Sequence, residues 1–247
     1  MTTTLITGAS SGLGAEMARQ LAGLGHDLAL CARRTDRLEE LRAEITSAHP
    51  DLRVAVRALD VTDHEAVFRV FEEFDEELGG IDKVVVNAGL GKGQPLGTGR
   101  FDANLQTAET NFIGALAQTE AAAAIFRRQN SGHLVMVSSF SALRGMPKNI
   151  TTYAATKAAV AHLAEGFRAD VHGTPIKVTV LYPGYIASEM SGTSARTPLM
   201  TSTEKGVRAM VEAIEKEKPR ARVPAWPWVP LGLVVKVVPA SVLKRMS

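Results

Sequence analysis

The sequence lacks several features that mark special classes of protein. It has one cysteine in 247 residues, Cys31, which excludes an internal disulfide and leads us to expect a reducing, cytoplasmic setting. No apolar run reaches the roughly 18 residues of a membrane-spanning helix, and the amino terminus carries no basic segment with an apolar signal core. The 28 basic and 26 acidic residues are well mixed, so no dedicated nucleic-acid surface is expected. We therefore expect a soluble protein of one domain over residues 1–247, and we predict no metal site.

What the sequence does contain is a regular alternation of short apolar runs and longer helical segments. The apolar runs are TTLIT, DLALCA, LRVAVRAL, KVVVN, HLVMVS and IKVTVLY, with a seventh candidate near RARVPA. The helical segments lie near residues 12–24, 36–48, 63–78, 104–129, 152–171 and 203–216. Runs that are apolar at nearly every residue suit strands covered on both faces. The pattern predicts an α/β fold of the Rossmann type, a doubly wound, mainly parallel sheet of about seven strands with helices on both faces.

A glycine-rich turn, TGASSGLG, joins the first predicted strand to the first helix. Gly8 suits a tight turn, Gly12 a close backbone approach to a pyrophosphate, and Gly14 the packing of helix on strand. The amide groups at the start of the helix would favour the anion. The spacing is G-x-x-x-G-x-G, which makes this turn a candidate dinucleotide site.

The same residues permit a second interpretation, because G-A-S-S-G matches the nucleophile elbow of a serine hydrolase around Ser10. That enzyme class also needs an acid and a histidine later in the chain. Six histidines are present, but none stands in a recognisable loop motif. This alternative leaves the pair of Tyr153 and Lys157 without a role.

Two arginines, Arg33 and Arg34, follow the second predicted strand, where a dinucleotide fold meets the adenosine ribose. An acid at this point selects NAD through the 2′-hydroxyl, whereas arginine accommodates the 2′-phosphate of NADP. The guanidinium group suits phosphate because its donors form a fixed fork. The alternative is that both arginines only begin a solvated helix. The pattern favours NADP(H) over NAD(H).

Tyr153 and Lys157 stand four residues apart in TTYAATKAAV, so a helix would place both on one face, one turn apart. The simpler alternative is a surface pair on an amphipathic helix. A free tyrosine has a pKa near 10, and a nearby ammonium group would lower it toward the range where general acids work best. The pair is thus a candidate acid with the cation that tunes it.

Several of these motifs in order resemble the short-chain dehydrogenase/reductase family: TGASSGLG, NAG at 87–89, SS at 138–139 and YAATK at 153–157. The resemblance extends to about Met190 and implies a nicotinamide-dependent oxidoreductase that interconverts a carbonyl and an alcohol. Tyr153 would be the proton donor and acceptor, and Lys157 would supply the charge and bind the nicotinamide ribose. Ser139 would orient the substrate, with Ser138 as the alternative, and Asn111 would hold a relay water or be a buried helix asparagine.

The resemblance also implies a set of cofactor contacts in the loops that follow the strands. The expected cofactor-binding residues are Gly8, Ser10, Ser11, Gly12, Leu13, Gly14, Arg33, Arg34, Asp60, Val61, Asn87, Ala88, Gly89, Tyr153, Lys157, Pro183, Gly184 and Ile186. Of these, Asn87 is the one for which a structural role is most expected.

Substrate, assembly and location are less well specified by the sequence. A polar, punctuated segment near 188–205 is predicted to be a substrate lid, and the substrate is expected to be an apolar carbonyl or alcohol. The resemblance and the alanine-rich helices at 115–124 and 154–164 suggest a homo-oligomer, a dimer or tetramer, although these alanines would also suit packing on the sheet.

The tail at 223–247 departs from the common family pattern and is apolar, with both tryptophans and four prolines. It either covers the substrate cleft, meets another subunit, or contacts a membrane peripherally, since tryptophan beside apolar and basic residues is typical of interfacial anchors. A non-catalytic nucleotide sensor or scaffold on the same fold is a further alternative for the whole protein. Such a protein would usually have lost Tyr153 or Lys157, and both remain.

Overall fold

A computed structural model of the chain describes residues 1–189, 199–239 and 241–243. Half of the predicted lid near 188–205, including Met190, lies outside the described residues, as do Lys244 and Arg245 of the tail.

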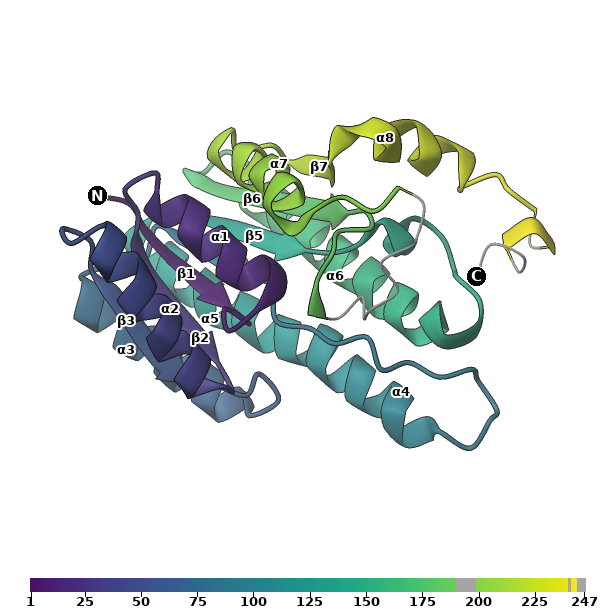
Figure 1. The fold of residues 1–247 in the computed structure, drawn as a ribbon, viewed down its shortest axis with the longest axis horizontal. Helices are drawn as coiled ribbons and strands as arrows, with labels where there is room; N and C mark the ends of the chain where they lie inside the picture. Colours follow the sequence, from purple (N-terminus) through teal and green to yellow (C-terminus); the bar gives the residue numbers. More distant parts are fainter. Residues whose placement is uncertain (190–198, 240, 244–247) are drawn as a thin grey trace.

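The seven strands of the described residues join one parallel sheet, as the apolar runs predict (Figure 1). Its order is β3-β2-β1-β4-β5-β6-β7. The strands are β1 (Thr3–Thr7), β2 (Asp27–Ala32), β3 (Val54–Ala58), β4 (Lys83–Val86), β5 (Gly132–Val137), β6 (Ile176–Pro183) and β7 (Arg220–Val223). The chain runs outward from β1 to β3 and then returns to start β4 on the other side of β1. Ligands of open α/β sheets bind at such a reversal, beyond the carboxyl ends of the strands.

Helices cover both faces of the sheet. They are α1 (Gly12–Ala22), α2 (Thr35–Ala48), α3 (His64–Leu78), α4 (Phe101–Ala108), α5 (Gly114–Gln129), α6 (Thr151–Asp170), α7 (Thr203–Glu215) and α8 (Ala225–Val234). One buried cluster joins the sheet to α3, α5 and α6, and the other joins it to α1, α2 and α7.

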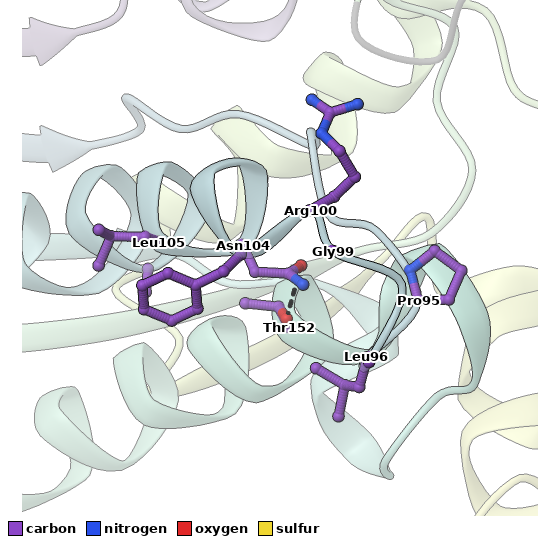
Figure 2. Close-up of a pocket in the computed structure, with 10 residues that line it drawn as sticks. Pro95, Leu96, Gly99, Arg100, Asn104, Leu105 and Thr152 are labelled. Carbon is purple, nitrogen blue, oxygen red and sulfur yellow. Dashed lines mark hydrogen bonds between the residues drawn. The ribbon is translucent and has the colours of Figure 1, made fainter.

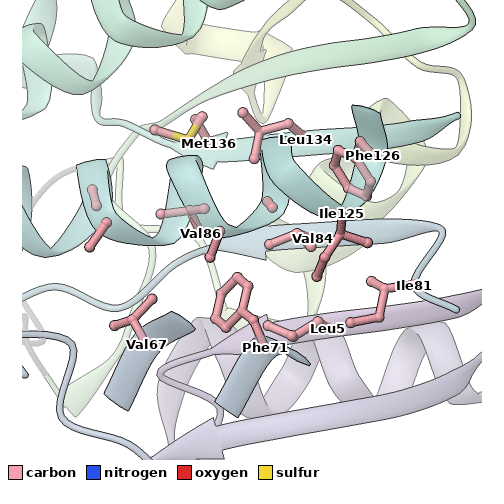
Figure 3. Close-up of a cluster of buried hydrophobic side chains, with 14 of the residues drawn as sticks. Leu5, Val67, Phe71, Ile81, Val84, Val86, Ile125, Phe126, Leu134 and Met136 are labelled. Atoms are coloured by element: carbon pink, nitrogen blue, oxygen red, sulfur yellow. The ribbon is translucent and has the colours of Figure 1, made fainter. Parts of the chain in front are cut away.

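Each central strand supplies both clusters, because successive side chains point to opposite faces. Leu5 and Val84 pack with Phe71 and Phe126 in the first cluster (Figure 3), whereas Ile6 belongs to the second. The near-continuous apolar runs are therefore explained by burial on both sides.

The helix predicted over 104–129 begins earlier and contains a π-helical turn. The turn is η1 (Glu109–Ile113), between α4 and α5, and Asn111 lies within it. Such turns insert one residue into a helix and are frequent at functional sites. Directly after the turn, Gly114 lies so close to β3's exit loop that a Cβ there would be 2.8 Å from the Val61 carbonyl oxygen.

Many alanines of the two alanine-rich segments face inward. Ala115, Ala121 and Ala122 of α5, and Ala161 and Ala164 of α6, are buried in the first cluster. These alanines thus fit the alternative of packing on the sheet, whereas Ala124 and Ala155 of the same segments are exposed.

The tail forms α8, a helix that the sequence analysis did not predict, beside β7 and far from β3 (Figure 1). Its anchor is Trp228, only 2% exposed, whose ring meets Phe140 and Tyr185 edge-on at centroid distances of 4.7 and 5.1 Å. Gly184 makes room for this ring, since a Cβ there would lie 2.0 Å from it. The tail therefore packs beside the loops that follow β5 and β6.

The two tryptophans of α8 allow a matched test of this anchoring. Trp228→Ala is expected to lower the free energy of unfolding by about 3 kcal/mol, because it removes a fully buried ring and leaves a cavity. Trp226 is 79% exposed, so Trp226→Ala should change that free energy by less than about 0.5 kcal/mol. Urea unfolding of the two variants makes the comparison, and equal effects would contradict the assigned packing.

Candidate active site

The glycine turn is fastened to the end of β4 by Asn87. Its Nδ2 donates to the carbonyl oxygens of Thr7 at 2.9 Å and Gly8 at 3.4 Å, while the amides of Asn87 and Ala88 donate to Oγ1 of Thr7 at 3.1 and 3.0 Å. Gly8 has a φ of +64°, and a Cβ on Gly14 would lie 2.3 Å from the Gly8 carbonyl oxygen. Both positions therefore need glycine. The structural role expected for Asn87 agrees with these contacts.

A polar hollow of about 160 Å³ lies at the carboxyl ends of β1 to β4. Nine predicted cofactor residues line it: Gly8, Ser10, Ser11, Arg33, Arg34, Asp60, Val61, Ala88 and Gly89. Residues far apart in the sequence thus meet at the reversal of strand order.

Several of the other predicted contacts do not line this hollow. Leu13 packs against the second cluster, and Ile186 turns its side chain into the same cluster. Pro183 is buried at the end of β6, and Gly184 faces Trp228. Gly12 lies beneath Ser188, where a Cβ on the glycine would be 3.4 Å from Ser188 Cβ.

This cradle fits a dinucleotide. Ser11 is the N-cap of α1, but its side chain makes no capping bond and instead accepts from Nη2 of Arg34 at 2.6 Å. The first amides of α1 are therefore not capped by that side chain, and such groups bind phosphate well. A Cβ on Gly8 would lie 2.9 Å from Ala88 Cα, so the narrow turn depends on the missing side chain.

Lys157 is buried near the end of β5, one helical turn beyond Tyr153 on α6. Its Nζ donates to the Val137 carbonyl oxygen at 2.8 Å, and the residue is 5% exposed. Burial lowers the pKa of Lys157 to about 8, so the group is still mainly charged at neutral pH. Its Nζ lies 5.9 Å from the centre of the Tyr153 ring. The helix spacing inferred from the sequence is confirmed.

The pKa of Tyr153 differs from the sequence-based expectation. Burial raises the pKa of this phenol, and a hydrogen bond with Ser139 opposes that with a smaller lowering effect. The expected lowering by Lys157 does not appear, because desolvation of the phenolate dominates. Tyr153 therefore holds its proton at neutral pH.

The two adjacent serines have different surroundings. Ser138 is buried, and its hydroxyl donates to the Lys157 carbonyl oxygen at 2.7 Å. Ser139 is partly exposed, accepts from the Ser141 amide at 3.2 Å and bonds with Tyr153. Ser139 is thus the serine that shares the accessible side with Tyr153.

Asn111 is 1% exposed and bonds both backbone groups of Leu90. Its Oδ1 accepts from the Leu90 amide at 2.7 Å, and its Nδ2 donates to the Leu90 carbonyl oxygen at 2.8 Å. A Cβ on Gly89 would lie 3.2 Å from Asn111 Oδ1 and 3.4 Å from Lys157 Nζ. Asn111 therefore lies near Lys157 and also orders the loop after β4.

The larger hollow, about 380 Å³, lies beside α4 and not at these groups. Figure 2 shows Leu96, Leu105 and Pro95 around it, with Asn104 bonded to Thr152 at 2.9 Å. Neither Tyr153 nor Lys157 lines it.

The hydrolase alternative finds no support around Ser10. Its Oγ accepts from Nε of Arg34 at 3.3 Å. All six histidines lie within the described residues, and none of them lines the hollow that contains Ser10. The two buried ones, His26 and His133, bond Thr4 and Thr179 near the amino ends of the strands.

Several residues of the site were missed by the sequence analysis. Ala32, Leu59, Leu90 and Thr110 also line the polar hollow. Thr110 could have been predicted, because it stands directly before Asn111. Arg37, which bonds Glu189 together with Arg34, could also have been predicted from its position three residues after Arg34. For Phe140 and Trp228 there was none, because their meeting depends on how the tail folds back.

The comparisons with known proteins identify the family. Residues 2–199 match the model of the short chain dehydrogenase family. An "uncharacterized oxidoreductase" of Mycobacterium tuberculosis is 54% identical over 243 residues, covering 98% of this chain and 96% of that protein. The chain therefore belongs to the short-chain dehydrogenase/reductase family, and it is an oxidoreductase with that family's nucleotide-binding fold.

Solved structures of other proteins share the fold of this chain. An alcohol dehydrogenase of Thermococcus sibiricus, complexed with 5-hydroxy-NADP, superposes with a TM-score of 0.81 at 27% identity, covering 90% of this chain and 95% of that one. A family member from Burkholderia phymatum, in complex with NAD, has a TM-score of 0.84 at 20% identity, covering 99% and 94%. The predicted fold class and family are confirmed.

The contacts of Asn87 lead to a prediction. Asn87→Ala removes the donor that holds Thr7 and Gly8, so it should lower the free energy of unfolding by about 1–3 kcal/mol and weaken dinucleotide binding. Urea unfolding and calorimetric titration measure the two effects. Asn149→Ala, in an exposed position, is the matched control, and an Asn87 variant as stable as this control would refute the role as a fastener.

Proposed function

We propose that the protein is an NADP(H)-dependent oxidoreductase that interconverts a carbonyl and an alcohol, with Tyr153 as the proton donor and acceptor. The observation that carries the proposal is the meeting of Ser139, Tyr153 and Lys157 beyond β5, beside the cradle that fits a dinucleotide. A single domain over residues 1–247 is supported by the one sheet that contains all seven strands of the described residues.

The nicotinamide group would supply or accept the hydride at the carbonyl carbon. Tyr153, protonated at neutral pH, is suited to give its proton to the carbonyl oxygen during reduction. Ser139 can donate a hydrogen bond to that oxygen and stabilise the negative charge that develops on it. Lys157 places a buried positive charge 5.9 Å from the centre of the Tyr153 ring, where it would bind the nicotinamide ribose.

For Asn111 we propose that its backbone contacts to Leu90 keep the loop beside Lys157 in place, next to any water that relays the proton. The π-helical turn supports this, since it points the side chain across to the loop after β4.

The preference for NADP(H) rests on Arg34, which reaches Ser10 and Ser11 of the glycine turn, and on Arg33 beside it in the hollow. The related alcohol dehydrogenase with a bound NADP derivative supports it, while the NAD complex shares the fold alone.

An apolar substrate is supported by the groups next to Ser139. Phe140 follows it directly, and Leu143 ends the same short helix. Trp228 and Tyr185 complete an apolar wall from α8 and the loop after β6. Such a wall favours a hydrocarbon or ring substituent on the carbonyl carbon.

The non-catalytic alternative has no specific observation in its favour. A sensor would bind the dinucleotide without needing Ser139 and Tyr153 to share an accessible, hydrogen-bonded position. Dinucleotide binding without turnover on any carbonyl or alcohol would favour it.

Association with other surfaces is proposed from exposed apolar side chains. Leu96, Phe101 and Leu105 are 67%, 74% and 41% exposed around the larger hollow, and they support a homo-oligomer. Trp226 and Val237, each 79% exposed, support peripheral membrane contact by the tail. Among the described residues no helix has the length and apolar character to cross a membrane, and a cytoplasmic location stays a prediction.

The proton-donor role of Tyr153 has a direct test. Tyr153→Phe should lower kcat by about 10²–10⁴-fold, the usual effect of losing a general acid, because the phenol oxygen alone is removed. NADPH affinity, followed by fluorescence titration, should stay within about threefold of the original. A phenylalanine variant with near-normal kcat would refute the mechanism.

Cofactor choice is tested at Arg34. Arg34→Ala should weaken NADPH binding by about tenfold or more, because charge-assisted bonds to phosphate are strong, while NADH binding should change far less. Arg42→Ala, whose side chain pairs with Glu39 elsewhere on α2, is the control. An original protein that binds NADPH and NADH equally well would remove the proposed preference.

A further inference from the structure

Glu189 pairs with two arginines at the start of α2, Arg34 and Arg37. Its Oε2 accepts from Nη1 and Nη2 of Arg34, both at 3.1 Å, and its Oε1 accepts from Nη1 of Arg37 at 2.5 Å. The carboxylate comes from the loop after β6, more than 150 residues further along the chain. One anion therefore bridges two guanidinium groups at the rim of the cofactor hollow.

The same donors suit a phosphate monoester. Arg34 is oriented by Ser10 and Ser11 at 3.3 and 2.6 Å, and it lies at the end of β2, where a dinucleotide fold meets the adenosine ribose. Carboxylate and phosphate oxygens both accept paired bonds from the guanidinium fork. The carboxylate of Glu189 thus takes the bonds that a ribose phosphate would need.

The backbone before Glu189 is held in place. The Ala187 amide donates to the Thr201 carbonyl oxygen at 3.0 Å, and the Thr201 amide donates to the Tyr185 carbonyl oxygen at 2.9 Å. Thr203 Oγ1 adds a bond to the Ala187 carbonyl oxygen at 2.7 Å. The last of these bonds is made by Ala187, two residues before Glu189. The segment that carries the Glu189 carboxylate to the arginines is therefore anchored by hydrogen bonds.

The ion pairs keep the carboxylate charged. Bonding to Arg37, and less strongly to Arg34 and Ser11, holds the pKa of Glu189 below its usual range. The side chain is 53% exposed, so solvent screens each pair and the carboxylate can leave at moderate cost.

We propose that Glu189 is an internal competitor for the site of the cofactor's 2′-phosphate. A phosphate on the adenosine ribose binds Arg34 and Arg37 in exchange for the Glu189 carboxylate, whereas a cofactor without that phosphate leaves these ion pairs intact. Glu189 therefore lowers the affinity for NADP(H) and narrows its advantage over NAD(H). Arg37 becomes a further phosphate-binding residue. The inference rests on the proposed use of NADP(H).

The test compares Glu189→Gln with the control Glu39→Gln. Both remove one negative charge, but Glu39 pairs with Arg42 and not with Arg34 or Arg37. The probes are adenosine 2′,5′-bisphosphate, which carries the ribose phosphate, and 5′-AMP, which lacks it, each titrated by calorimetry at fixed salt. Fluorescence titrations with NADPH and NADH repeat the comparison on whole cofactors.

Glu189→Gln should bind the bisphosphate and NADPH about two- to tenfold more tightly than the original protein, since exposed ion pairs are weak individually. Its affinity for 5′-AMP and NADH should stay within about twofold of that of the original protein. Glu39→Gln should leave the affinities for all four ligands unchanged. Adding Arg37→Ala to Glu189→Gln should abolish the gain for the bisphosphate.

Two results would overturn this inference and leave the proposed function standing. One is a Glu189→Gln protein that binds NADPH no more tightly than Glu39→Gln does, and the other is weaker binding of NADH, which would mean that Glu189 accepts from the 2′-hydroxyl. If the original protein and Glu189→Gln both bind the bisphosphate no better than 5′-AMP, the preference for NADP(H) fails as well. If the original protein binds no dinucleotide, the proposed function itself fails.

Discussion

The arrangement of the site depends on the hydrogen bonds that join the end of β1 to the end of β4. Asn87 and Thr7 tie the two strands together where the strand order reverses, and they do so across the glycine turn. Gly8 and Gly14 leave the space that the Asn87 amide fills, since a Cβ on Gly14 would lie 2.8 Å from its Nδ2. The start of α1, the loop after β4 and the polar hollow between them all take their positions from this junction.

A second constraint is the burial of Lys157. A buried ammonium group needs an acceptor, and the Val137 carbonyl oxygen at the end of β5 supplies it. Because the lysine is held there, its own carbonyl group meets the Ser138 hydroxyl, which occupies that serine and leaves Ser139 for the accessible side. These two bonds join α6 to the end of β5 and so bring Tyr153 and Ser139 to the same site.

The sequence predicted most of this fold, because its strands are buried on both faces and their apolar runs are unambiguous. It predicted the spacing of Tyr153 and Lys157, which is a local property of one helix. It did not predict α8, because this helix is buried through one ring and not through a periodic apolar face. It also did not predict the π-helical turn at Asn111, because such a turn leaves no mark in the amino-acid composition of the helix. The pKa of Tyr153 and the pairing of Glu189 with Arg37 were also missed, because desolvation and contacts between distant segments depend on the assembled structure.

The contact between Gly184 and Trp228 has a consequence for how this chain can vary in evolution. Gly184 lies in the turn after β6, and any side chain there would occupy the volume of the indole ring. Position 184 can therefore accept a larger residue only if position 228 changes to a smaller one or the tail leaves the body. Relatives with a different tail are free of that restriction, so the two positions should covary among proteins that keep α8 and drift independently in those that do not.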